Sequence, residues 1–236
     1  SVACGKSQSR RNRIFQKQGV YDKVARTACF VKTGRAPVKV RWVEVNKGDE
    51  QNPDYRSRLV AMEFKTDSSA EWFSGTPPLE ALRFVCSDWA SSGHGADTDR
   101  SRDKCMVVID VKKAHLRAPA TREVFVELPK EDQEPGEENM CGLLRYSMYG
   151  TRDAAANWSE EYTERIQSMG FTVGKATPCV FYHAGRGLRA YVHGDDFVAV
   201  GEPTELNWMK ERIEQKYEWK TEIIGPGKGQ CHEVRV

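Results

Sequence analysis

Alternating apolar and polar residues, and one continuous apolar run, divide the first half of the chain into expected strands. Residues 38–45 and 55–64 favour strand, and the segment between them, 46–54, is dense in turn-forming residues. This pattern predicts a long hairpin with a charged tip. Residues 105–109 form a continuous apolar run, which is typical of a strand buried on both faces, and residues 123–128 predict one more strand.

Apolar residues at helical spacing predict three helices. The first begins at Thr76-Pro77-Pro78, because proline is tolerated in the first helical turn, and ends at Gly93. The second covers residues 154–169 and stops at Gly170, and the third covers residues 203–217.

Two apolar strands are expected on either side of an acidic turn near the end of the chain. Residues 188–192 lead into His193-Gly194-Asp195-Asp196, and the apolar pattern resumes at residues 197–201. Residues 179–182 predict a neighbouring strand, joined to the first through the hairpin turn 184–187. The mixed order of strands and helices predicts an α+β domain with helices packed on an antiparallel sheet.

Three aspartates lie at the ends of these apolar strands. Asp110 follows one strand, and Asp195 and Asp196 lie between two others. Neighbouring carboxylates repel one another, and leaving them unpaired at the edge of a core is costly. Divalent cations such as Mg²⁺ relieve this cost because hard oxygen ligands suit them. Two ions about 3.5–4 Å apart can activate a 3′-hydroxyl and stabilise a leaving pyrophosphate.

Two other interpretations of these carboxylates stay open on the residues alone. Adjacent aspartates between strands are often only a hairpin turn. A metal-dependent nuclease or phosphatase can also use the same three carboxylates.

Gly194 permits a tight turn and the close approach of a nucleic-acid backbone.

Composition narrows the class of protein without naming a partner. Of 236 residues, 39% are hydrophobic and 30% are charged, and no run of about 18 apolar residues predicts a membrane span. The net charge of +2 does not by itself indicate a nucleic-acid partner. Basic residues are nevertheless concentrated between Lys6 and Lys65, where they could neutralise phosphates or form a solvated surface. Seven cysteines without a Cys-x-x-Cys pair argue against a disulfide scaffold and a zinc ribbon, and predict reduced thiols in an intracellular protein.

Five sequence motifs follow one another in order along the chain. They are Arg41 to Gly48, Tyr55 to Ala61, Asp110 to Leu116, Leu144 to Trp158 with Ser147-Met148-Tyr149-Gly150 inside it, and His193 to Asp196. Together they resemble the reverse transcriptase of Ty1/copia-type LTR retrotransposons, part of a Pol polyprotein. That family has Lys-Trp-Val, Tyr-Lys-Ala-Arg-Leu-Val-Ala, Asp-Val-Lys-Thr-Ala-Phe-Leu, Ser-Leu-Tyr-Gly and Tyr-Val-Asp-Asp at the matching places.

The resemblance implies a right-hand polymerase with fingers and palm, an antiparallel palm sheet backed by helices, and a thumb that is missing or incomplete. A basic N-terminal segment (1–20) would precede a fingers-like region (21–104). The palm would cover 105–202, with fingers insertions around 120–150, and the end of the palm and start of the thumb connection would cover 203–236. The implied activity is that of an RNA-directed DNA polymerase, a nucleotidyltransferase.

The resemblance also implies roles for particular residues. Asp110, Asp195 and Asp196 would be catalytic and, with the carbonyl of Val111, would hold two Mg²⁺ or Mn²⁺ ions. The implied nucleotide-binding residues are Arg56, Arg58, Lys112, Lys113, Ala114, His115, Tyr149 and Gly150. His193 and Gly194 would position the primer.

The implied partners are dNTP and a primed RNA or DNA template, and no membrane is expected as a partner. The implied location is intracellular, in the cytoplasm or in a virus-like particle. The RNase H and integrase parts of a Pol polyprotein are expected to be absent from this chain. Because a palm without its thumb should hold the template-primer poorly, we expect weak or no processive synthesis. A catalytically inactive retroelement relic or a nucleic-acid-binding fragment is the alternative, and a metal-dependent nuclease is a third interpretation.

The chain departs from the family pattern at several of these positions. His115 replaces an aromatic residue expected to exclude a ribose 2′-hydroxyl, and an imidazole can both block and hydrogen-bond that group. His193 and Gly194 replace Tyr-Val, which implies looser primer positioning. Asp153 and Ala155 replace Gln and Pro, and Asp153 is expected to add negative charge near the template path.

Overall fold

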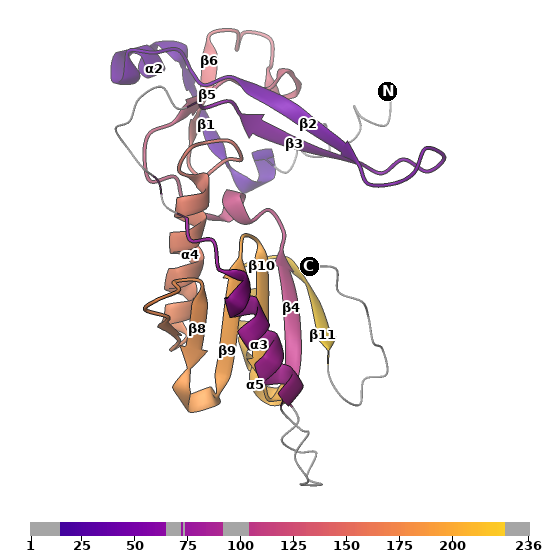
Figure 1. The fold of residues 1–236 in the computed structure, drawn as a ribbon. Helices are drawn as coiled ribbons and strands as arrows, with labels where there is room; N and C mark the ends of the chain where they lie inside the picture. The colour runs from indigo at the N-terminus through magenta and orange to yellow at the C-terminus, as the bar shows by residue number, and fades with distance from the viewer. Residues whose placement is uncertain (1–14, 65–71, 73, 92–103, 225–236) are drawn as a thin grey trace. The chain divides into compact units, whose positions relative to one another are not determined.

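Residues 15–64, 72, 74–91 and 104–224 are described by the computed structural model, and they belong to two units of the chain (Figure 1). Unit 1 comprises residues 1–73 and 115–158, and unit 2 comprises residues 74–114 and 159–236. The chain passes between the units several times, and one passage lies within helix α4 (Ala154–Ser168).

Unit 2 is built on a six-stranded sheet with the strand order β11-β4-β10-β9-β8-β7. Its strands are β4 (Cys105–Val111), β7 (Thr172–Val173), β8 (Val180–His183), β9 (Leu188–His193), β10 (Asp196–Gly201) and β11 (Trp219–Ile224). Every pair of neighbours is antiparallel. The central strands β4 and β10 are almost entirely buried, as their continuous apolar sequences require.

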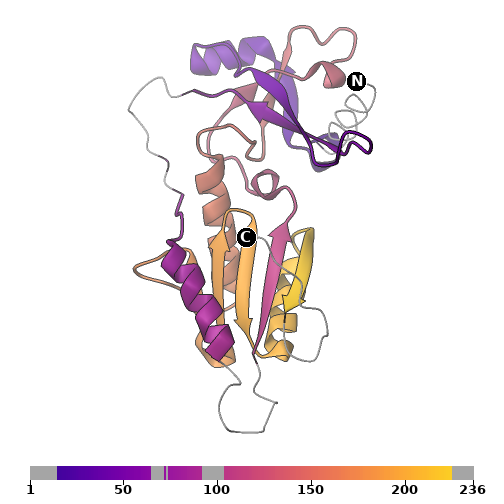
Figure 2. The same cartoon turned by 45° about the vertical axis from the view of Figure 1, so that its right-hand side comes forward.

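Helices cover both faces of this sheet (Figures 1 and 2). On one face, α3 (Leu79–Ser91) packs through Val85 against a cluster that includes Met106 and Val198. The other face is covered by α5 (Pro203–Glu214), which buries Leu206, Met209 and Ile213, and by the part of α4 that belongs to unit 2. Burial of apolar area on both faces makes the sheet a rigid support for residues at its edges.

Unit 1 contains a three-stranded antiparallel sheet and a separate hairpin. The sheet has the order β1-β6-β5, with β1 (Tyr21–Ala25), β5 (Phe125–Val126) and β6 (Met140–Leu144), and the hairpin pairs β2 (Val40–Asn46) with β3 (Tyr55–Ala61). Helix α2 (Arg26–Thr33) follows β1 and ends at Gly34, and short 3₁₀ helices lie at η2 (Ala114–Arg117), η3 (Lys130–Asp132) and, in unit 2, η4 (Ala184–Arg186). Apolar residues from the hairpin and the sheet share one buried cluster that includes Leu59, Val126, Leu144 and Met148.

The long elements expected from the sequence are confirmed. The hairpin, the three helices and the strands that contain residues 105–109, 188–192 and 197–201 all form, in a mixed α/β fold with antiparallel sheets. The expected strand 123–128 is correct only over Phe125–Val126, and the third helix ends at Glu214. Gly93 and most of the basic N-terminal segment lie outside the described residues.

Several short elements were not expected from the pattern. They are β1, α2, β6, β7 and β11. In β1 the polar residues Asp22 and Lys23 interrupt the apolar pattern. The strand accommodates them because Asp22 forms an ion pair with Arg145 and Lys23 forms one with Glu137. None of the helices in the described ranges is both long and apolar enough to cross a membrane. The described cysteines, at positions 29, 86, 105, 141 and 179, carry free thiols.

Candidate functional site

Two of the three aspartates lie side by side on the central strands of unit 2. Asp110 in β4 and Asp196 in β10 are register partners. Side chains alternate along a strand, so Asp110 lies on the same face as Met106 and Val108, which pack in the cluster beneath α3. The apolar part of this face is covered, and Asp110 and Asp196 are exposed at its end.

The same register extends across four strands. Lys220 of β11 pairs with Asp110, Asp110 pairs with Asp196, and Asp196 pairs with His193 of β9. Directly opposed residues of antiparallel strands point to the same face. The end of the sheet therefore presents a row of a lysine, two aspartates and a histidine, of which the sequence predicted all but Lys220.

The third aspartate lies in the turn between β9 and β10. Gly194 has φ +63°, a left-handed conformation that glycine adopts without strain, and this closes the turn tightly. The carbonyl of Asp195 accepts a hydrogen bond of 2.9 Å from the backbone N–H of Val111. This bond ties the acidic turn to β4 and holds Asp195 beside the Asp110–Asp196 pair.

Electrostatic repulsion is concentrated at this end of the sheet. Although Asp196 is exposed to solvent, neighbouring protein atoms partly desolvate its carboxyl and so raise its pKa above the ordinary value. The charges of Asp195 and Asp110 raise this pKa further, and His193 opposes them. None of the ion pairs among the described residues involves any of the three aspartates.

The three aspartates do not form a closed metal site in the described part of the chain. Within residues 15–64, 72, 74–91 and 104–224, no group of three or more His, Cys, Asp or Glu side chains is gathered closely enough to enclose a metal ion. The carboxylate oxygens of the three aspartates nevertheless fit a hard divalent cation, because such cations prefer oxygen ligands. No ion pair with a basic residue in the described part of the chain occupies these carboxylates.

The segment after Asp110 has an unusual backbone. Lys112 donates its N–H to the carbonyl of Glu218 at 2.9 Å. Lys113 has φ +61°, and it is the one non-glycine residue with positive φ in the described part of the chain. Its ammonium lies 4.0 Å from the Glu218 carboxylate. A lysine in this conformation costs about 1–3 kcal/mol and is typical of functional segments. Ala114 and the side chain of Val111 are fully buried.

In unit 1, three of the predicted nucleotide-binding residues meet around one aromatic ring. The rings of Tyr149 and His115 have centroids 4.7 Å apart with planes at 54°. The guanidinium carbon of Arg58 lies 5.9 Å from the Tyr149 centroid, which is within the range of a cation–π contact. These residues come from a turn, a 3₁₀ helix and a hairpin strand that are far apart in the sequence.

One face of the hairpin carries three arginines. Arg56 and Arg58 alternate along β3, and Arg41 of β2 pairs with Val60, the next residue on the same face. All three arginines are exposed. Arg41 was not among the predicted site residues. The strand register would have identified it once the hairpin was assigned.

Gly150 lies tightly against this hairpin. Its φ is +87°, and a Cβ atom added there would be 2.0 Å from the carbonyl oxygen of Ala61 and 2.6 Å from Cγ1 of Val60. The preceding Tyr149 carbonyl accepts a hydrogen bond of 2.7 Å from the N–H of Ala61. Both the conformation and the space therefore require glycine, and they fix the turn that carries Tyr149.

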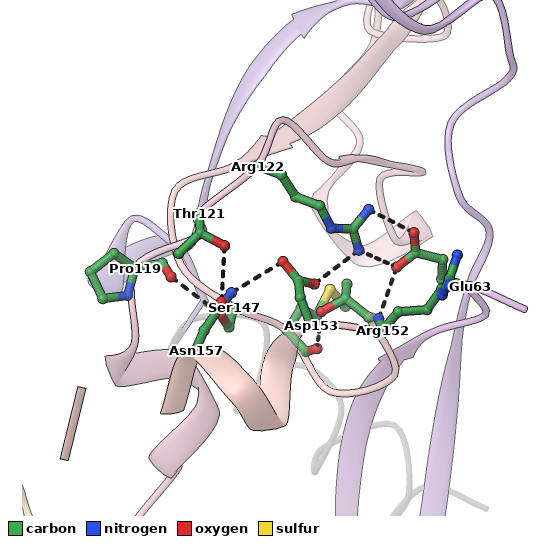
Figure 3. A network of polar contacts seen from close by, with 10 residues as sticks. Glu63, Pro119, Thr121, Arg122, Ser147, Arg152, Asp153 and Asn157 are labelled. Carbon is green, nitrogen blue, oxygen red and sulfur yellow. Dashed lines mark hydrogen bonds and ion pairs between the residues drawn. The ribbon is translucent and has the colours of Figure 1, made fainter. Parts of the chain in front are cut away.

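A network of buried and partly buried polar groups lies next to this turn (Figure 3). Arg122 donates to both oxygens of Glu63 at 2.8 and 2.5 Å and to Asp153 at 2.9 Å. Asn157 donates to Asp153 at 3.1 Å and to the hydroxyl of Ser147 at 2.9 Å. Asp153, expected from the sequence to add negative charge, is only 2% exposed and is ion-paired with Arg122. It therefore presents little charge to solvent.

Comparison with known proteins gives the family. The profile of the family described as "Reverse transcriptase (RNA-dependent DNA polymerase)" matches residues 26–225. The chain belongs to this family. The resemblance to Ty1/copia-type reverse transcriptases is thereby confirmed.

Two curated relatives of this chain come from plant transposons. It is 25% identical over 200 residues to the retrovirus-related Pol polyprotein from transposon TNT 1-94 of Nicotiana tabacum, covering 81% of this chain and 14% of that protein. It is 25% identical over 191 residues to the retrovirus-related Pol polyprotein from transposon RE1 of Arabidopsis thaliana, and this match covers 78% of this chain and 12% of that protein. The matches thus span about one seventh of the length of these relatives or less.

A solved structure of the foamy viral protease-reverse transcriptase dRH in complex with ds DNA is also similar. The identity is 12% and the TM-score is 0.47, and the match covers 93% of this chain and 31% of that chain.

The tight packing of Gly150 generates a prediction about stability. Gly150→Ala adds a methyl group in strained left-handed backbone and against the Ala61 carbonyl, so we expect the free energy of unfolding to fall by about 2–4 kcal/mol. The matched control is Gly136→Ala, where φ is +95° and nothing lies within 4 Å of the added Cβ. Urea unfolding of both variants measures the difference. Equal losses would show that the contact with Ala61 contributes nothing.

The pairing of Asp153 generates a prediction about pH. Burial opposes its ionisation, but Arg122 and then Asn157 hold the pKa of Asp153 below its ordinary value. A lowered carboxyl pKa gives stability that is complete above the unfolded-state pKa of about 4 and is lost as the pH falls through the folded-state value. Asp153→Asn should therefore reduce the free energy of unfolding by about 2 kcal/mol at neutral pH. The difference should shrink toward about pH 2, where the carboxyl is protonated in both states.

Urea titrations of both proteins across that pH range measure the effect. A difference that stays constant with pH would show that the ionised form of Asp153 does not contribute.

Proposed function

We propose that this chain is the catalytic part of an RNA-directed DNA polymerase that transfers a nucleotide from dNTP to a primer 3′-hydroxyl. The observation that carries the proposal is the pairing of Asp110 with Asp196 on adjacent strands, with Asp195 held beside them by its bond to Val111. The family membership of residues 26–225 gives the reaction class.

The acidic end of the sheet in unit 2 would hold two Mg²⁺ or Mn²⁺ ions. Asp110, Asp195, Asp196 and the carbonyl of Val111 are the ligands proposed here. When bound, the ions would increase the acidity of the primer hydroxyl and stabilise the charge of the leaving pyrophosphate. The chain itself needs mainly to position charge, because phosphoryl transfer depends on positioning and electrostatics. His193, in register with Asp196, and Gly194 in the acidic turn would contact the primer end.

Unit 1 would supply contacts to the incoming nucleotide. Arg56 and Arg58, exposed on one hairpin face, would pair with triphosphate oxygens as charge-assisted donors. Tyr149 and Gly150 would lie under the nucleotide and the template base. His115, which packs against Tyr149, would contact the sugar. Lys112, Lys113 and Ala114, which directly follow the aspartate strand, would line the triphosphate and sugar.

In this proposal the hairpin corresponds to the fingers and the sheet of unit 2 to the palm. The proposed macromolecular partner is a primed RNA or DNA template. The relatives are Pol polyproteins, so we also propose that the natural protein works as part of a longer polyprotein.

Single-nucleotide extension of an oligo(dT) primer on poly(rA), with Mg²⁺ or Mn²⁺, tests this function. Asp110→Asn should reduce extension by about 100-fold or more, because it removes one carboxylate ligand. The matched control is Asp22→Asn, which removes the carboxylate of an exposed ion pair with Arg145 and should leave extension unchanged. Extension that survives Asp110→Asn would contradict the assignment, and absence of extension by the unaltered chain with both metals would favour a relic that only binds nucleic acid.

A further inference from the structure

The polar network of unit 1, which is buried at Asp153 and Asn157 and partly buried at Glu63 and Arg122, joins three segments that are distant in the sequence (Figure 3). Glu63 follows the hairpin strand β3, and Arg122 lies between η2 and β5. Asp153 directly precedes α4, and Asn157 lies in the first turn of that helix. Arg122 lies between the carboxylates of Glu63 and Asp153 and is hydrogen-bonded to both. Its guanidinium carbon is also 5.8 Å from the centroid of the Trp72 ring.

Glu63 connects this network to the turn that carries Tyr149 and Gly150. One of its carboxylate oxygens accepts a hydrogen bond of 2.9 Å from the backbone N–H of Arg152. Two residues earlier, the N–H of Ala61 donates to the carbonyl of Tyr149 at 2.7 Å. The chain segment 61–63 thus holds the turn on both sides of Gly150.

The helical side of the turn is held by a second group of hydrogen bonds. Asn157 bonds to Asp153 and to Ser147, and its side-chain oxygen accepts from Thr121 at 2.9 Å. Ser147 and Asn157 are 2% and 5% exposed. Buried hydrogen-bonded groups of this kind are costly to separate, so the turn is restricted to one arrangement.

The two carboxylates of the network depend on a single cation. Both carboxylate oxygens of Glu63 accept hydrogen bonds from Arg122. The guanidinium nitrogen Nη2 of Arg122 donates both to Glu63 and to Asp153. A bidentate arginine fixes orientation as well as charge. Loss of either carboxylate should therefore loosen the hold on the turn without emptying the apolar core beside it.

We propose that Glu63, Arg122 and Asp153 are positioning residues that hold the Tyr149–Gly150 turn against the hairpin and so set the affinity for the incoming nucleotide. The inference rests on the proposed function, in which Tyr149 and Gly150 contact that nucleotide. None of the three residues needs to touch the nucleotide. They act through the position of Tyr149, whose ring lies next to His115 and Arg58.

Two measurements on the complete 236-residue chain test the proposal. Hydrogen–deuterium exchange reports whether the turn is held, and it does not require activity. Equilibrium binding of dTTP, with Mg²⁺ and a dideoxy-terminated primer on poly(rA), reports nucleotide affinity without chemistry. The main variant is Glu63→Gln, which keeps the shape of the side chain and removes its charge. Asp153→Asn is the second variant and applies if the first does not fold.

Glu63→Gln should speed hydrogen exchange at the amides of Ala61 and Arg152. It should also weaken dTTP binding about tenfold, because that is the effect expected if the turn adopts its nucleotide-binding arrangement about one tenth of the time. The matched control is Glu123→Gln, which removes an exposed ion pair with Lys32 in the same unit. It should change neither quantity.

Unchanged exchange at Ala61 and Arg152 would show that the network does not hold the turn. Faster exchange with a dTTP affinity within about twofold of the unaltered chain would show a purely structural role, and either result overturns the proposal. Lack of dTTP binding by the unaltered chain overturns it as well. An unaltered chain that binds dTTP in this network-dependent way but extends no normal primer would count against the proposed function alone.

Discussion

Asp110 and Asp196 are held next to each other by the antiparallel pairing of β4 with β10, although their charges repel. The strands can hold them because both are buried almost throughout, between α3 on one face and α4 and α5 on the other. The hydrophobic burial of the sheet therefore offsets the electrostatic cost at its end. A bound cation removes that cost, and this is the physical link between the fold and the proposed chemistry.

Unit 1 solves a different positioning problem. Its candidate residues come from a hairpin, a 3₁₀ helix and a turn, and short contacts bring them together. Gly150 permits the turn to approach the Ala61 carbonyl, and Glu63 with Arg122 fixes the other side of the turn. A flexible turn would leave Tyr149 with several orientations, whereas this one places its ring next to both Arg58 and His115.

The parts of this arrangement that depend on local pattern were predictable from the sequence. Residues 105–109 and 197–201 are continuous apolar runs, so their strands and the aspartates at their ends could be assigned directly. Strand β11 and its Lys220 were missed because polar residues interrupt its apolar pattern, and its pairing with β4 depends on contacts distant in sequence. Arg122 and Glu63 belong to no motif. Their interaction joins residues 59 positions apart, and only the folded chain reveals it.

The central claim, that the row of carboxylates binds divalent cations, is tested most directly by titrating Mn²⁺ into the chain and following the free ion by electron paramagnetic resonance. The unaltered chain should bind Mn²⁺, and Asp196→Asn should bind it at least about tenfold more weakly. Asp88→Asn, in which the lost carboxylate pairs with Lys104 and Arg189 elsewhere in unit 2, should bind it as the unaltered chain does. Equal Mn²⁺ binding by the unaltered chain and the Asp196→Asn variant, or no binding by either, would contradict the account.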